Sequence, residues 1–175
     1  MKRWTLYVTL VLLLLASLLT AACGGSPPAP LTEEALKNAE YMGVYEDPVQ
    51  LTDGKYEGEP FVEGGASRPT VLFIEPYALG DLNGDGAEDA AVLLVENSGG
   101  SGSFVYLAAV LNQDGKPENK ATVLLEDRAQ VKSLTIADGQ ITVELVTHGP
   151  EDPMCCPSQE ETRVYKLEGN QLIQQ

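Results

Sequence analysis

The chain has 175 residues, enough for one domain of ordinary size, and its 26 acidic residues outnumber its 11 basic residues to give a formal charge of −15. So acidic a chain is repelled by nucleic acid and by anionic lipid headgroups, and no Lys/Arg cluster offsets the charge. The composition therefore predicts a single domain that does not bind nucleic acid.

Residues 1–22 have the order of a signal peptide. Lys2 and Arg3 form a positive start, residues 4–22 carry no charge, and small residues precede Cys23. An ordinary secretory signal and an uncleaved anchor helix are the alternatives. Removal of this segment takes the basic residues from 11 to 9 and leaves a formal charge of about −17.

The end of this segment, Leu19-Thr20-Ala21-Ala22-Cys23, resembles the lipobox of bacterial lipoproteins, with Thr20 where that pattern has an aliphatic residue. The resemblance implies cleavage before Cys23, a diacylglycerol on its sulfur, and a domain anchored outside the cytoplasm at the cell membrane or outer membrane. Membrane contact is then expected through the lipid anchor. Residues 23–31 are expected to form a Gly/Pro-rich tether, and residues 32–175 a single β-rich domain.

A short helix is expected at the start of the domain. Thr32 can cap it, and two glutamates follow where the helix dipole favours acids. Leu31 and Leu36 have the spacing of a hydrophobic staple. Gly43 is the expected end of the helix.

From residue 49 onward, short apolar segments alternate with turn signals. Asp53-Gly54, Asp138-Gly139 and Gly169-Asn170 predict two-residue hairpins, because such turns need residues that adopt positive φ. Asp114-Gly115 indicates a longer turn.

Three segments predict how the strands are buried. Residues 70–74 and 90–95 are continuously apolar, which favours strands covered on both faces, whereas residues 141–145 alternate and favour one solvent-exposed face. The predicted fold class is mainly β, an antiparallel sheet or sandwich of about seven to nine strands with one short N-terminal helix.

Residues 81–89 predict a calcium-binding loop. Calcium prefers about six to eight oxygen ligands, and oxygens at alternate positions of a short loop can surround the ion. Gly86 permits the sharp turn that brings them together. The candidate ligands are Asp81, Asn83, Asp85, the backbone carbonyl of Ala87, and Asp89.

An EF-hand is excluded because its last ligand, a bidentate Glu, is replaced by Val92 inside an apolar segment. Through Leu79-Gly80-Asp81 and Asp89-Ala90-Ala91, the loop is similar to the strand-loop-strand calcium loops of FG-GAP and VCBS-type extracellular repeats. The resemblance covers only this segment and implies a structural role for calcium. A metal-free turn is the alternative, although three carboxylates would then repel one another.

The cysteines that follow the strands have two explanations. Cys155 and Cys156 are adjacent, and a trans peptide holds their Cα atoms about 3.8 Å apart, closer than in ordinary disulfides. They belong either to a structural loop, as a vicinal disulfide or packed thiols, or with Met154 and His148 to a redox or soft-metal site for copper(I) or zinc.

No catalytic arrangement is indicated. Residues 99–103 lack the final Gly of a nucleophile elbow and are expected to form a hairpin turn, and Glu160 and Glu161 are expected to be solvated loop charges. The favoured function is a non-enzymatic, membrane-anchored lipoprotein that binds calcium structurally and an unidentified partner or ligand. The alternative is a redox or soft-metal-handling lipoprotein that acts through the cysteine loop.

Overall fold

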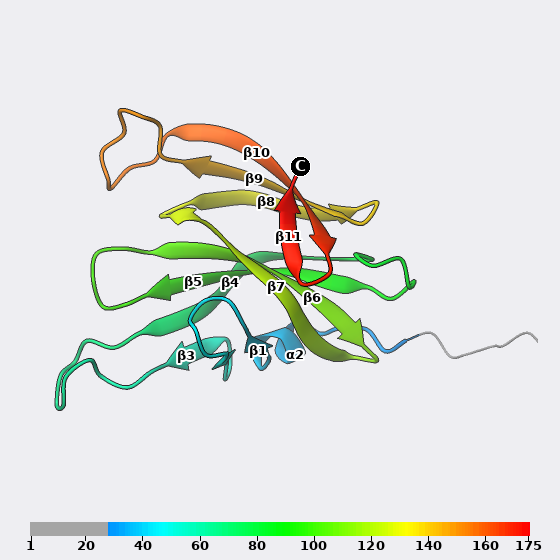
Figure 1. Cartoon of the computed structure of the whole chain (residues 1–175), viewed down its shortest axis with the longest axis horizontal. Helices are drawn as coiled ribbons and strands as arrows, with labels where there is room; N and C mark the ends of the chain where they lie inside the picture. Colours follow the sequence, from blue (N-terminus) through cyan, green and yellow to red (C-terminus); the bar gives the residue numbers. More distant parts are fainter. Residues whose placement is uncertain (1–27) are drawn as a thin grey trace, which may run out of the picture.

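The computed structural model describes residues 28–175, so the predicted signal peptide and the predicted lipidation site Cys23 lie outside the described residues. The described part is mainly β, with one short helix and eleven strands in three antiparallel sheets (Figure 1). None of its helices is long and apolar enough to cross a bilayer. The elements are α2 (Glu33–Lys37), β1 (Glu40–Tyr41), β2 (Val49–Gln50), β3 (Lys55–Glu57), β4 (Thr70–Gly80), β5 (Asp89–Asn97), β6 (Phe104–Gln113), β7 (Lys116–Asp127), β8 (Gln130–Ala137), β9 (Gln140–Thr147), β10 (Gln159–Glu168) and β11 (Gln171–Gln174).

The mainly β, antiparallel prediction with one N-terminal helix is confirmed, but the expected seven to nine strands are too few. β1 and β2 contain two residues each and pair only with one another. A strand that short has no alternation to detect, because alternation needs several residues. Whether such a short segment forms a strand depends on the segment that pairs with it rather than on its own sequence.

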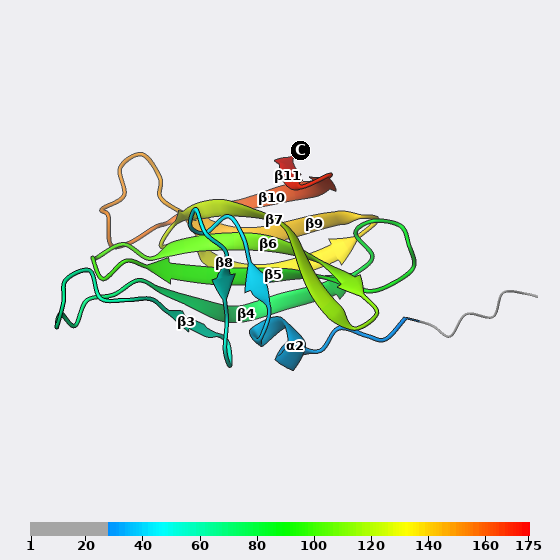
Figure 2. The same ribbon diagram turned by 60° about the horizontal axis from the view of Figure 1, so that its bottom comes forward.

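Two larger sheets stack face to face (Figures 1 and 2). One has the strand order β3-β4-β5-β6-β7 and the other has the order β11-β10-β9-β8. Strands that follow one another in the chain are neighbours in each sheet, so most connections are hairpins. The helix and the β1–β2 pair lie on the outer face of the five-stranded sheet, which gives the molecule a third layer.

The layers enclose two cores. Between the two larger sheets, Leu93 and Leu107 pack with Ile141 and Val143, and all four are fully buried. The second core lies between the five-stranded sheet and the N-terminal layer; its members include Leu36, Tyr41, Val49, Val92, Leu94 and Val110. β5 contributes alternate side chains to both cores, which confirms that residues 90–95 are covered on both faces.

The same prediction is wrong for part of residues 70–74. Val71 and Phe73 enter the second core, but Leu72, on the opposite face of β4, is 40% exposed. Ile74 on that face packs against the inter-sheet core, whereas Leu72 lies beyond it. The reason is that the four-stranded sheet does not cover this end of β4. By contrast, residues 141–145 alternate as predicted, with Glu144 exposed.

The two-residue turns at Asp138-Gly139 and Gly169-Asn170 are confirmed as hairpins, whereas Asp53-Gly54 closes only a single bridge between Thr52 and Lys55, because β2 pairs with β1 and β3 with β4. Asp53-Gly54 and Asp138-Gly139 have positive φ at both positions, and Gly169 is also in the left-handed region. Asp114-Gly115 was expected to be part of a longer turn, but Gln113 pairs directly with Lys116. Both turn residues have positive φ, so this is a tight hairpin of the same kind.

The helix begins as predicted and ends early. The Thr32 hydroxyl accepts a hydrogen bond from Ala35 N–H at 3.1 Å, and Leu31 and Leu36 are both buried. The helix ends at Lys37 rather than near Gly43, with Asn38 as its C-cap. The chain then enters β1 at once, and this pairing replaces further helical turns.

The described chain already contacts the domain at its start. Ala29 N–H donates to Asp114 at 3.2 Å, and the Asn112 side chain donates to Ala29 O at 2.8 Å. Leu31 is 4% exposed. The last residues of the expected tether, 29–31, therefore belong to the folded domain.

Candidate calcium-binding loop

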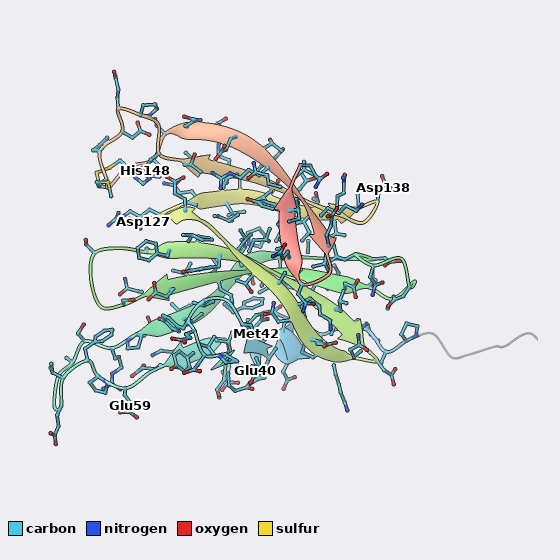
Figure 3. All side chains as sticks on the ribbon, in the orientation of Figure 1. Glu40, Met42, Glu59, Asp127, Asp138 and His148 are labelled. Carbon is cyan, nitrogen blue, oxygen red and sulfur yellow. A yellow bond between two sulfur atoms is a disulfide. The ribbon has the colours of Figure 1, made fainter. Side chains whose placement is uncertain are left out.

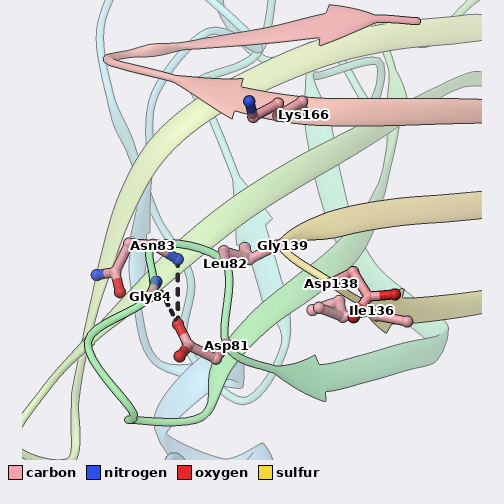
Figure 4. A pocket seen from close by; sticks show the side chains of 9 residues that line it. Asp81, Leu82, Asn83, Gly84, Ile136, Asp138, Gly139 and Lys166 are labelled. Atoms are coloured by element: carbon pink, nitrogen blue, oxygen red, sulfur yellow. Dashed lines mark hydrogen bonds between the residues drawn. The ribbon is translucent and has the colours of Figure 1, made fainter.

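The candidate calcium loop joins β4 to β5 at one end of the molecule. It lies beside the β8–β9 turn, and together they border a pocket of about 560 Å³ (Figure 4). The residues that line the pocket are Asp81, Leu82, Asn83, Gly84, Ile136, Ala137, Asp138, Gly139 and Lys166. The sequence offered no signal for the contribution of β8, the β8–β9 turn and β10, because they are far away along the chain.

Asp81 organises the first half of the loop. Its carboxylate accepts backbone N–H groups from Asn83 at 3.2 Å, Gly84 at 2.6 Å and Gly86 at 3.0 Å. These donors, with the Gly84 N–H first, hold the pKa of Asp81 below its ordinary value. Gly86 has φ +85°, as expected for the sharp turn at this position.

Asn83 and Asp85 organise the second half. Asn83 Oδ1 accepts Asp85 N–H at 2.9 Å, and the Asp85 carboxylate accepts Ala87 N–H at 2.7 Å and the Asn83 side-chain amide at 2.8 Å. Asn83 and Asp85 are exposed, whereas Ala87 is buried. Short side chains that accept backbone N–H groups two residues onward are a common way to build a tight loop.

Asp89 differs from the other carboxylates because it is fully buried. It accepts Leu82 N–H at 2.9 Å and Asn112 N–H at 2.9 Å, which ties the loop to β6. Burial raises the pKa of Asp89, and the negative charges of Asp85 and Asp81 add to the increase. The three carboxylates are therefore close enough for their charges to interact.

The arrangement has the oxygen chemistry that calcium requires, but the ligands are not gathered around one point. Within residues 28–175, no group of three or more Asp, Glu, His or Cys side chains is already arranged to hold a metal ion. The loop carboxylates instead accept backbone hydrogen bonds. A carboxylate has lone pairs to spare, so it can keep such a bond and also bind a cation. Calcium binding would thus require the loop carboxylates to come closer together than they are here.

The cysteine loop lies between β9 and β10. Cys155 and Cys156 are joined as a disulfide, with their Cα atoms 3.8 Å apart, and both residues are exposed. Figure 3 shows His148 at the same end of the molecule as the disulfide, and Asp138, beside the candidate calcium loop, at the opposite end. The two candidate sites are therefore separate.

The structure gives His148 other partners than the cysteines. One ring nitrogen lies 3.2 Å from Glu126 Oε1 and the other 3.2 Å from the backbone oxygen of Met154. Arg128 also donates to that oxygen, at 2.9 Å, while the Met154 side chain is 70% exposed. These contacts hold the loop against β7 and use the histidine as a hydrogen-bonding group.

The remaining candidate segments from the sequence lie in a connection between strands and in strand β10. Residues 98–103 connect β5 to β6, as expected for a hairpin turn. Glu160 and Glu161 were expected in a loop, but they lie in β10, where Glu161 accepts the Thr147 hydroxyl at 3.0 Å. A strand was expected to precede the Gly169-Asn170 turn, as β10 does, but the acidic and polar residues at its start hid its first part.

Comparisons of the chain with protein-family models, with curated proteins and with solved structures found no match. A functional assignment therefore depends on the loop geometry and on the sequence.

Proposed function

We propose that the protein is a non-enzymatic, membrane-anchored lipoprotein whose extracytoplasmic domain binds calcium structurally and presents a surface to a partner or ligand. The observation that carries the calcium proposal is the loop from Asp81 to Asp89. It places three interacting carboxylates and one side-chain amide between two core strands. No sequence or structural feature supports catalysis by this loop.

Electrostatics favours a cation there. Asp89 is buried among hydrogen-bond donors but has no cationic partner within residues 28–175, and Asp81 and Asp85 add negative charge. A divalent cation would offset this repulsion and brace the connection between β4 and β5. Extracellular calcium modules commonly have dissociation constants of about 10⁻⁴–10⁻³ M.

The test is thermal unfolding of the full chain in a non-ionic detergent, with 10 mM calcium or a chelator at matched ionic strength. Binding to the native state alone should stabilise it by about 1.4–2.7 kcal/mol at these affinities, a rise of a few degrees in Tm. Asp85→Ala should remove most of this gain in Tm, because it deletes a candidate calcium ligand. Its hydrogen bonds lie within the loop, so the change is local.

Glu88→Ala is the matched control. Glu88 is exposed, lies in the same loop and carries the same charge, but it is not a predicted ligand, so this variant should keep the calcium response. Identical melting curves in calcium and in chelator would show that the loop is a metal-free turn. An equal calcium-dependent rise in Tm in Asp85→Ala and Glu88→Ala would show that calcium acts through the general negative charge of the loop and not through a specific site.

The second candidate is redox or soft-metal chemistry at the cysteine loop, favoured by the exposure of the Cys155–Cys156 disulfide. An exposed disulfide is open to thiol–disulfide exchange. A maleimide should label Cys155 and Cys156 after mild reduction and neither of them before it. A stoichiometric copper or zinc ion that is lost in His148→Ala would instead favour metal handling over the calcium-module proposal.

A further inference from the structure

A groove of about 320 Å³ lies on the N-terminal layer, away from both loops described above. One wall comes from the segment between β1 and β2, another from β3 and the loop that follows it, and a third from the end of β5. The residues that line the groove are Tyr45, Glu46, Asp47, Pro48, Val49, Tyr56, Phe61, Pro69 and Ser98. Its walls are aromatic and apolar, its polar groups are acidic or hydroxyl groups, and no Lys or Arg lines it.

Two tyrosines and a phenylalanine give the groove its aromatic surface. The rings of Tyr45 and Tyr56 are 6.4 Å apart between centroids and inclined at 54°. Phe61 is 57% exposed, so its ring is open to a ligand in the groove. Aromatic rings of this kind attract cations through their electron-rich faces.

A buried carboxylate stands behind this surface. Glu96 is 4% exposed, and its carboxylate accepts the Tyr45 hydroxyl at 2.9 Å and the Ser98 hydroxyl. Burial, helped by Glu96, raises the pKa of Tyr45, so its hydroxyl remains a donor at neutral pH. Glu96 therefore orients the tyrosine and contributes negative potential to the groove.

The negative charge around the groove is not neutralised within residues 28–175. Glu96, Glu46 and Asp47 take part in no ion pair there, although the other carboxylates of the domain form several. A buried carboxylate without a cation is costly, and a ligand that supplies the positive charge recovers part of that cost.

We propose that this groove binds a small alkylammonium ion, seated against Tyr45, Tyr56 and Phe61 and attracted by Glu96, Glu46 and Asp47. The aromatic and proline side chains suit the alkyl groups, and the carboxylates suit the charge. Anionic ligands are disfavoured by the same charges. The site is independent of calcium and of the cysteine loop.

The experiment is an NMR titration of the full chain, in a non-ionic detergent free of ammonium groups, with choline as the probe. Ring signals of Tyr45 and Tyr56 should shift and saturate. The uncharged isostere 3,3-dimethyl-1-butanol should bind at least about tenfold more weakly, because it has the same shape without the charge. Equal binding of the isostere would overturn the proposal and leave an apolar groove.

Variants locate the binding. Tyr56→Leu should weaken choline about threefold to fivefold, and the exposed pair Glu46→Gln/Asp47→Asn, which leaves the core intact, should weaken it at least twofold. Glu151→Gln/Glu168→Gln removes the same charge from exposed positions outside the groove and should bind as the parent does. Parent-like affinity in both groove variants would overturn the assignment.

Discussion

The aspartates of this domain have different properties because their burial and their hydrogen-bond donors differ. Asp81 accepts three backbone N–H groups at the surface, and its pKa is lowered. Asp89 accepts two N–H groups in the interior, and burial raises its pKa. Asp152 caps the cysteine loop by accepting N–H groups from Gly149 at 2.8 Å and Ser158 at 2.7 Å. Burial and hydrogen-bond donors together set the role of each aspartate.

Asp152 provides a pH prediction for the cysteine loop. The Gly149 N–H, followed by the Ser158 hydroxyl, lowers the pKa of Asp152 below its ordinary value of 3.8. Because the pKa is lowered in the folded state, the stabilisation that the Asp152 carboxylate gives is fully present above about pH 4. It is lost as the pH falls through the pKa of the folded state. Protection of the Gly149 and Ser158 amides, measured by NMR relative to intrinsic exchange, should decrease once the pH is lower than about 4.

Asp152→Asn separates this carboxylate from the other acids that titrate in the same range. The variant should show weak protection of both amides at every pH, with no acid transition of its own. Protection in the parent that is unchanged between pH 6 and pH 2.5 would contradict the assigned role.

At the scale of the element, β5 and β4 show that similar apolar sequences are buried differently. β5 is central, lies between β4 and β6, and has a layer on each face. β4 has only the three-residue strand β3 on its other side, and its exposed residue Leu72 lies beyond the inter-sheet core.

Leucine truncation in the two strands should therefore have unequal effects. Leu93→Ala removes a fully buried side chain from the inter-sheet core and should lower the free energy of unfolding by about 2–5 kcal/mol. Leu72→Ala should lower it by less than about 1 kcal/mol. Urea denaturation of both variants with the parent measures the difference. Equal losses would mean that Leu72 is covered in solution.

At the scale of the whole molecule, the ends of the domain have different roles. The described chain begins at the end where Ala29 contacts the β6–β7 turn, and the β3–β4 loop, which carries Phe61, lies at the opposite end (Figures 1 and 2). Under the proposed anchoring, the groove would thus be presented away from the membrane attachment.

The anchor itself is tested at Cys23. Cys23→Ser removes the sulfur that would carry the diacylglycerol, so fatty-acid labelling should disappear and the protein should be released or remain unprocessed. Labelling with a radioactive fatty acid, followed by membrane fractionation, measures both effects. Cys156→Ser is the matched control and should leave labelling unchanged, because Cys156 lies in the disulfide of the folded domain. Labelling that persists in Cys23→Ser would contradict the anchor.

The sequence by itself determined the features that local interactions control. The Thr32 cap, the Asp138-Gly139 turn and the alternation of residues 141–145 need only neighbouring residues, and all were found as predicted. The oxygen-rich composition of residues 81–89 was also apparent, although calcium binding there remains a prediction.

The tertiary structure decided the features that depend on contacts between distant residues. It ended the helix at Lys37, exposed Leu72, and brought Tyr45 to Glu96, 51 residues onward. It also turned the Asp89 carboxylate toward Asn112 of β6 and gave His148 the partners Glu126 and Met154. No local pattern encodes these outcomes, because burial and pairing depend on which layer covers a strand once the sheets have stacked.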